Sequence, residues 1–159
     1  MATQTVILPV NGGRLLSGTA TTVAEFGSVH KILLDDSDTH GLEWRFNLPQ
    51  DYVGSPVLKF TFSMASATTN DVYMQSRINA ITPNTEAEPG SADSYNNSAI
   101  TVAGTGGYTK QGSITLTSND SMSANDYVQL ELRRNGGDAS DTATGDMELL
   151  DAKLEYSDV

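Results

Sequence analysis

Histidine is the usual general base of a hydrolytic triad, and the sequence holds two candidates, His30 and His40. Both lie near expected turns, and a triad would need a nucleophile within hydrogen-bond reach of one of them. Neither has a G-x-S-x-G nucleophile motif to work with. The chain has no cysteine, which excludes a thiolate nucleophile and a sulfur-ligated metal site. The sequence therefore favours two solvated turn histidines over a catalytic base.

Paired carboxylates could supply acid and base for glycoside hydrolysis, and a β-sandwich can host them. The candidates are Glu43, Glu131, Glu148 and Glu155. Each stands opposite the apolar residues in an alternating segment, which predicts a solvated side chain and not a buried acid with a raised pKa. The sequence thus predicts that the protein is not an enzyme, with a glycan-degrading enzyme as an alternative.

Two segments have oxygen-rich spacings that could bind a hard cation. Residues 36–41 resemble the start of an EF-hand loop, but its twelfth position would be Asn47 and not a bidentate Glu. Residues 135–146 join two expected strands and carry three carboxylates. Asp and Asn that bond their own backbone, together with Gly at positive φ, explain both segments without metal. We expect no metal and no cofactor, with a cation at 135–146 as the alternative.

Composition limits the elements that could position these groups. The chain has 159 residues, the size of one domain, and its 20 acids against 9 bases give a net charge of -11. This charge repels phosphate backbones and anionic membrane surfaces. No apolar run approaches the ~20 residues of a membrane helix, and the start of the chain lacks the features of a signal peptide. We expect a soluble protein that binds neither nucleic acid nor membrane.

Alternation of apolar and polar residues is the main structural signal. It predicts strands with one buried face, and no segment has a helical period. Nine segments qualify: 6–10, 31–34, 42–48, 58–64, 71–81, 99–103, 113–117, 127–133 and 147–156. About eight strands with loops of unequal length predict an all-β, antiparallel β-sandwich of jelly-roll type. We expect an extended N-terminal arm over residues 1–30, which hold few large apolar side chains, and the sandwich domain over 31–159.

Four tyrosines are candidate partner-binding residues. Tyr73 and Tyr127 should point away from the core, and Tyr95 and Tyr108 lie in a long surface excursion over residues 82–110. Tyrosine rings stack on carbohydrate, but they are equally common at subunit contacts. The sequence therefore leaves a glycan platform and a protein interface as alternatives.

Three segments carry a family resemblance. Residues 44–52 (WRFNLPQDY), 125–134 (NDYVQLELRR) and 141–156 (DTATGDMELLDAKLEY) resemble jelly-roll domains of tailed-bacteriophage virion proteins. The resemblance implies a structural virion protein. Its single-domain size favours a capsid decoration (cement) protein that binds the outer surface of a phage head and stabilises it. The alternative is the receptor- or glycan-binding head domain of a phage fibre or tail.

The same resemblance implies partners and a location. The partners would be the major capsid protein and further copies of the chain, often as a homotrimer, at the capsid surface of a virion made in the host cytoplasm. The arm would then bind a neighbour by adding a strand to its sheet edge. Val6, Ile7 and Leu8 are the residues expected to pair.

Overall fold

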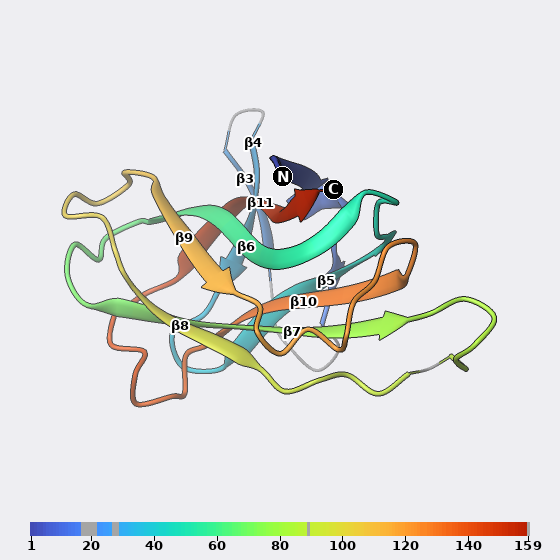
Figure 1. Ribbon diagram of the computed structural model, residues 1–159. Helices are drawn as coiled ribbons and strands as arrows, with labels where there is room; N and C mark the ends of the chain where they lie inside the picture. Colours follow the sequence, from blue (N-terminus) through green and yellow to red (C-terminus); the bar gives the residue numbers. More distant parts are fainter. Residues whose placement is uncertain (17–21, 27–28, 89, 159) are drawn as a thin grey trace.

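The chain folds into two antiparallel sheets packed face to face, as Figure 1 shows. The computed structural model describes residues 1–16, 22–26, 29–88 and 90–158. Sheet A has the order β3-β4-β11-β6-β9, with β1 also paired to β11, and sheet B has the order β2-β5-β10-β7-β8. The strands of sheet A are β1 (Thr3–Leu8), β3 (Thr22–Phe26), β4 (Val29–Leu34), β6 (Tyr52–Met64), β9 (Lys110–Thr115) and β11 (Met147–Asp158). The strands of sheet B are β2 (Arg14–Leu15), β5 (Thr39–Asn47), β7 (Asp71–Ile81), β8 (Asn96–Thr101) and β10 (Tyr127–Asn135).

The core lies between the sheets and follows the alternation in the sequence. In β6, Leu58, Phe60 and Phe62 are at most 1% exposed, while the residues between them face outward. In β10, Leu130 and Leu132 are fully buried in the same way. Because side chains of a strand alternate between its two faces, each central strand of the sandwich has one face in the core and one outside.

The structure confirms the predicted all-β jelly-roll-type sandwich, with more strands than expected. Eleven strands lie in the described residues, and the two that the pattern missed are β2 and β3. β2 has only two residues, too few for a period of two to be recognised. The described residues include no helix long and apolar enough to cross a membrane.

The N-terminal segment, expected as an extended arm over residues 1–30, contributes strands to the sandwich in its described part. β1 pairs antiparallel with β11 of its own chain, with Val6 opposite Leu154 and Ile7 opposite Lys153. Leu8 is 2% exposed and belongs to the core. β1 thus occupies an edge of β11 within the same chain. Burial of the Leu8 side chain in the core stabilises this arrangement. Residues 17–21 and 27–28 of the expected arm lie outside the described residues.

Candidate functional site

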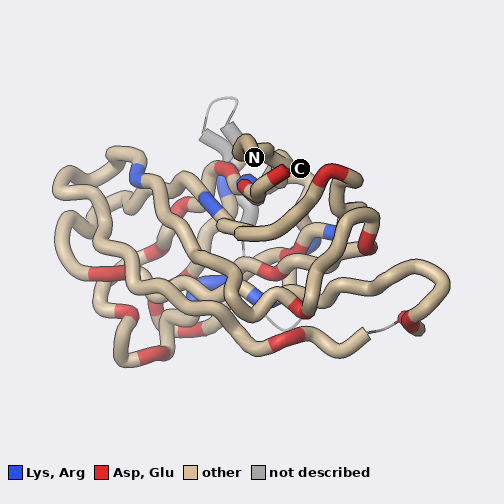
Figure 2. Tube along the Cα trace, viewed as in Figure 1, with Lys and Arg blue, Asp and Glu red and all other residues tan. Residues whose placement is uncertain are grey.

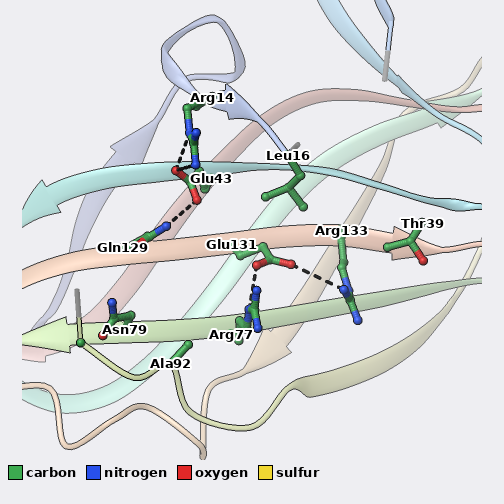
Figure 3. Close-up of a pocket in the computed structure, with 11 residues that line it drawn as sticks. Arg14, Leu16, Thr39, Glu43, Arg77, Asn79, Ala92, Gln129, Glu131 and Arg133 are labelled. Carbon is green, nitrogen blue, oxygen red and sulfur yellow. Dashed lines mark hydrogen bonds and ion pairs between the residues drawn. The ribbon is translucent and has the colours of Figure 1, made fainter. Parts of the chain in front are cut away.

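A cleft opens on the outer face of sheet B, and Figure 3 shows the side chains that line it. Its volume is about 420 Å³. This volume lies in the range of small-molecule sites. Its floor consists of outward side chains of β5, β7 and β10, and its walls come from β2 with Leu16 and from the segment before β8. We call it the sheet B cleft. It is lined by Arg14, Leu16, Thr39, Glu43, Arg77, Asn79, Gly90, Ala92, Gln129, Glu131 and Arg133.

Strand register aligns four charged residues across the floor. Arg14 of β2 pairs with Glu43 of β5, Glu43 pairs with Glu131 of β10, and Glu131 pairs with Arg77 of β7. The row therefore reads Arg, Glu, Glu, Arg from strand to strand. Two like charges directly opposite one another on antiparallel strands are destabilising. The arginines at both ends of the row offset this cost.

Glu43 is 4% exposed although it faces outward from the sheet. Arg14 Nε donates a hydrogen bond to Glu43 Oε1 over 2.7 Å, Arg45 Nη2 lies 3.2 Å from the same oxygen, and Gln129 Nε2 donates to Oε2. Burial raises the pKa of Glu43, but the hydrogen bonds from Gln129 and Arg14 and the nearby guanidinium charges outweigh burial and hold the pKa below its ordinary value. Glu43 is therefore a carboxylate that accepts hydrogen bonds.

Glu131 is 6% exposed and has a matching set of partners. Arg77 Nε donates to Glu131 Oε2 over 2.7 Å, the Tyr95 hydroxyl donates to Oε1 over 2.9 Å, and Arg133 Nη1 lies 3.8 Å from Oε1. Burial raises the pKa of Tyr95, and the charge and hydrogen bond of Glu131 raise it further. Glu131 thus has two guanidiniums and a phenol as its neighbours.

These two acids do not form a glycosidase pair. That reaction needs one carboxylic acid that holds its proton near neutral pH, which means a raised pKa. Glu43 has the opposite shift, and Glu131 is occupied by an arginine and a tyrosine. The expectation that both glutamates are solvated is wrong, because the cleft walls and the paired side chains bury them. Both carboxylates are instead held by charge-assisted hydrogen bonds from neighbouring side chains.

Asn79 adds a buried acceptor to the cleft. Its side chain is 7% exposed, and its Oδ1 has no hydrogen-bond partner among the described residues. Gly90 lies against it, so that a Cβ at position 90 would stand 2.5 Å from Asn79 Oδ1. A buried polar atom without a partner costs free energy. Because Gly90 lies against this oxygen, a ligand hydroxyl would bond to it and recover that cost only if the segment at Gly90 moved aside.

The structure separates the four predicted tyrosines. Tyr95 lies at the cleft, but its ring is covered by Arg133, whose Cζ stands 3.8 Å from the ring centroid. Tyr73 and Tyr127 share the outer face of sheet B at opposite ends, because Tyr127 pairs with Ile81, eight residues beyond Tyr73 or about 26 Å away. Tyr108 is 67% exposed in the loop between β8 and β9. These four side chains do not form one platform.

The arginines of the cleft were missed as site residues in the sequence. Arg77 and Arg133 look like ordinary outward positions of their strands, and Arg14 lies in the segment expected to be an arm. The signal that could have found them is the alternation itself, which places Glu131 and Arg133 on one face of β10 and Arg77 on the same face of β7. Recognising the site still required the strand order.

The oxygen-rich segments are occupied by internal contacts. Arg134, fully buried, donates to both carboxylate oxygens of Asp141 over 2.9 and 2.7 Å and to the carbonyl oxygens of Leu34, Ala143 and Gly145. Asp36 accepts a hydrogen bond from the Gly145 amide. In the described chain no three His, Asp or Glu side chains are grouped as a metal site needs. These contacts explain the loop over residues 135–146 as a structural connection.

Charge is distributed unevenly around this site. Figure 2 shows acidic residues along many of the loops, consistent with the net charge of -11. The outer face of sheet B nevertheless holds four of the five arginines: Arg14, Arg45, Arg77 and Arg133. The cleft is thus a basic region of an acidic protein.

Comparisons with known proteins give structural matches but no sequence family. No protein-family model matches the chain, and no curated protein matches it. A family 35 carbohydrate binding module from Clostridium thermocellum matches with a TM-score of 0.60 and 11% identity, over 96% of this chain and 98% of that chain. The family 11 carbohydrate-binding module of Clostridium thermocellum, solved with a β-1,3-1,4-mixed-linked tetrasaccharide, matches with a TM-score of 0.50 and 11% identity, over 94% of each chain.

Part of an enzyme shares the fold as well. An exo-β-1,3-galactanase from Phanerochaete chrysosporium, solved with galactose, matches with a TM-score of 0.53 and 14% identity over 96% of this chain but only 29% of that chain. At these identities the matches establish the fold. They support the jelly-roll part of the resemblance seen in the sequence, and they give no support to the link with phage proteins.

Proposed function

We propose that this chain is a non-catalytic domain that binds carbohydrate in the sheet B cleft. The observation that carries the proposal is the set of side chains converging on this cleft, where two buried carboxylates, arginines and amides line a single depression. Sugar hydroxyls are both donors and acceptors, so they need fixed groups of both kinds. The carbohydrate-binding modules with the same fold support this reading.

The cleft has groups of both kinds in fixed positions. Asn79 Oδ1 is a buried acceptor without a partner among the described residues, and the amide of Gln129 is held in place by its hydrogen bond to Glu43. Ion pairs between neighbouring strands hold the charged side chains, which reduces the entropy lost on binding. The site is therefore preorganised for a polar ligand.

A glycan-binding screen with the purified chain tests the proposal. We expect binding to at least one oligosaccharide, with an affinity that falls severalfold in Asn79→Ala because an acceptor is lost. Thr61→Ala, on the outer face of β6 in sheet A, is the matched control and should bind as the unmodified chain does. The proposal fails if no glycan binds, or if both variants lose affinity equally.

The capsid decoration role stays a prediction of the sequence resemblance, together with the homotrimer, the major capsid protein as partner and the virion location. Its expected mechanism requires β1 to join another subunit, whereas β1 lies on β11 of its own chain. The alternative from the same resemblance, a glycan-binding head of a fibre or tail, agrees better with the cleft. Carbohydrate binding is therefore the function we propose.

A further inference from the structure

The guanidinium groups of the sheet B cleft exceed the carboxylates that they bind. Glu43 is approached by Arg14 and Arg45, and Glu131 is approached by Arg77 and Arg133. Each carboxylate is therefore approached by two positive charges, although Arg45 does not itself line the cleft, whose lining holds three arginines and two glutamates. Since Glu43 and Glu131 lie directly opposite one another on neighbouring strands, these two groups of charges are adjacent.

Donor geometry points in the same direction. Arg77 uses Nε to bind Glu131, and Arg133 uses Nε to bind Gln75 Oε1 over 2.9 Å. The Nη groups of Arg77 make no hydrogen bond to another described residue, and the nearest carboxylate oxygen to an Nη group of Arg133 is at 3.8 Å, beyond hydrogen-bond distance. These terminal groups form the fork that binds carboxylates and sulfates with two parallel hydrogen bonds.

The guanidinium groups of Arg77 and Arg133 both pack against the ring of Tyr95. The Cζ atoms of Arg77 and Arg133 lie 4.8 and 3.8 Å from the centre of its ring. Both side chains reach solvent, with exposed fractions of 42% and 22%. Two guanidiniums are thus held at one ring with donor groups left for a ligand.

Neighbouring acids are held by other contacts. Asp93 follows the cleft residue Ala92, but its carboxylate accepts hydrogen bonds from the backbone amides of Ser94 and Asp120. Asp38 precedes the cleft residue Thr39, and its carboxylate accepts the Thr39 amide. In the described part of the chain, neither carboxylate forms an ion pair with an arginine of the cleft.

We infer that the ligand of the sheet B cleft is an anionic carbohydrate, whose uronate carboxylate or sulfate ester binds the Nη groups of Arg77 and Arg133. This inference rests on the proposed carbohydrate function and names its substrate class. Glu131 neutralises one of the two positive charges of Arg77 and Arg133, and the negative group of the sugar neutralises the other. The sugar hydroxyls contact the acceptor at Asn79 and the amide of Gln129.

Calorimetric titrations with oligosaccharides of equal length test the inference. The probes are an oligogalacturonate, a sulfated oligosaccharide and a neutral xylo-oligosaccharide, each at low salt and at 0.15 M salt. We expect one or both acidic probes to bind at least about tenfold more tightly than the neutral probe, a ratio typical of a charged hydrogen bond. Salt should weaken the acidic probes more than the neutral one. The acidic probe that binds identifies a carboxylate or a sulfate as the anion.

Variants separate charge from fork geometry. Arg77→Gln should lower the affinity for the acidic probe about tenfold or more, and Arg77→Lys should recover part of it, because lysine keeps the charge without the fork. Lys59→Gln is the matched control, since Lys59 is an ion-paired cation on the outer face of sheet A. Thermal unfolding of each variant identifies a loss of fold, and Arg133→Gln then provides the second test of the same fork.

The outcomes distinguish the inference from the function on which it rests. Equal affinity for neutral and acidic sugars, unchanged by Arg77→Gln, would overturn the anionic ligand and leave carbohydrate binding intact. Binding of polyglutamate as tightly as of the acidic sugars would overturn carbohydrate recognition and leave only attraction of anions. No binding of any probe would overturn both.

Discussion

Both sheets carry ion pairs on their outer faces, but the cations and the burial of the acids differ between them. On sheet A, Lys31 pairs with Glu148 over 2.9 Å, and Lys59 and Lys153 pair with Glu155 over 2.6 and 2.9 Å. On sheet B the cations are arginines, and their acids Glu43 and Glu131 are almost completely buried. All four lysines of the chain lie in sheet A strands and all five arginines in sheet B strands.

The difference shows what turns an outward sheet face into a binding site. Sheet B has walls, because the β2 strand and the segment at Gly90 and Ala92 border the row of charges. The backbone amide of Asp93 donates to the Ile78 carbonyl over 2.9 Å and fastens that segment to β7. Walls reduce solvent access, which strengthens the ion pairs and fixes their geometry. Planar guanidiniums then retain a fork of two parallel donors, a geometry that the ammonium group of a lysine lacks.

Removal of the central acid should give the largest contrast between the faces. Glu131→Gln leaves Arg77 and Arg133 without their carboxylate, and we expect the free energy of unfolding to fall by about 2 kcal/mol, less than for a fully buried pair because both arginines reach solvent. Glu155→Gln on sheet A should cost about 0.5 kcal/mol or less. Urea denaturation measures both, and equal losses would contradict the distinction between the faces.

Tyr95 provides a smaller test of the same network. Tyr95→Phe removes the hydrogen bond to Glu131 but keeps the ring beneath the arginines, so we expect a loss of about 1 kcal/mol. Tyr108→Phe is the control, because Tyr108 is exposed in a loop and should change stability by no more than a few tenths of a kcal/mol. An unaltered stability of Tyr95→Phe in urea denaturation would show that the hydroxyl contributes nothing to the network.

Gly90 tests the wall of the cleft directly. Gly90→Ala places a Cβ against Asn79 Oδ1, so this side chain must shift and the ligand should lose severalfold in affinity, about 1 kcal/mol or less. Gly104→Ala meets nothing within 4 Å and is the matched control. Titration of both variants with the same oligosaccharide makes the comparison, and equal affinities would place the ligand away from this wall.

The pH dependence of stability should differ least between the outer faces of the two sheets. The folded-state pKa of Glu43 lies below its ordinary value of 4.5, so its contribution to stability is complete above that pH and is lost as the pH falls through the folded-state pKa. Burial raises the pKa of Glu148 on sheet A, but the hydrogen bonds from Lys31 and Ser63 outweigh it, so the same sign applies. Urea denaturation at pH 3 to 7 should show that Glu43→Gln and Glu148→Gln each reduce the loss of stability below about pH 4.5. A variant that loses stability below about pH 4.5 as steeply as the unmodified chain would contradict the assignment of that glutamate.

The outward direction of Tyr73, Glu131 and Arg133 followed from the sequence. Alternation with a period of two is a local property, so each strand reports its own buried and exposed faces. The burial of Glu43 could not be predicted in this way. It depends on Arg14 and Gln129, which the fold brings to Glu43 from 29 and 86 residues away.

The sequence by itself determined a sandwich of alternating strands, because the hydrophobic pattern within each strand decides which face enters the core. The tertiary structure decided which outward residues meet. Strand order and register place Arg14, Glu43, Glu131 and Arg77 in one row, and the segment at Gly90 borders it. These contacts join residues that are far apart in the chain. A local sequence pattern cannot predict which distant residues will meet.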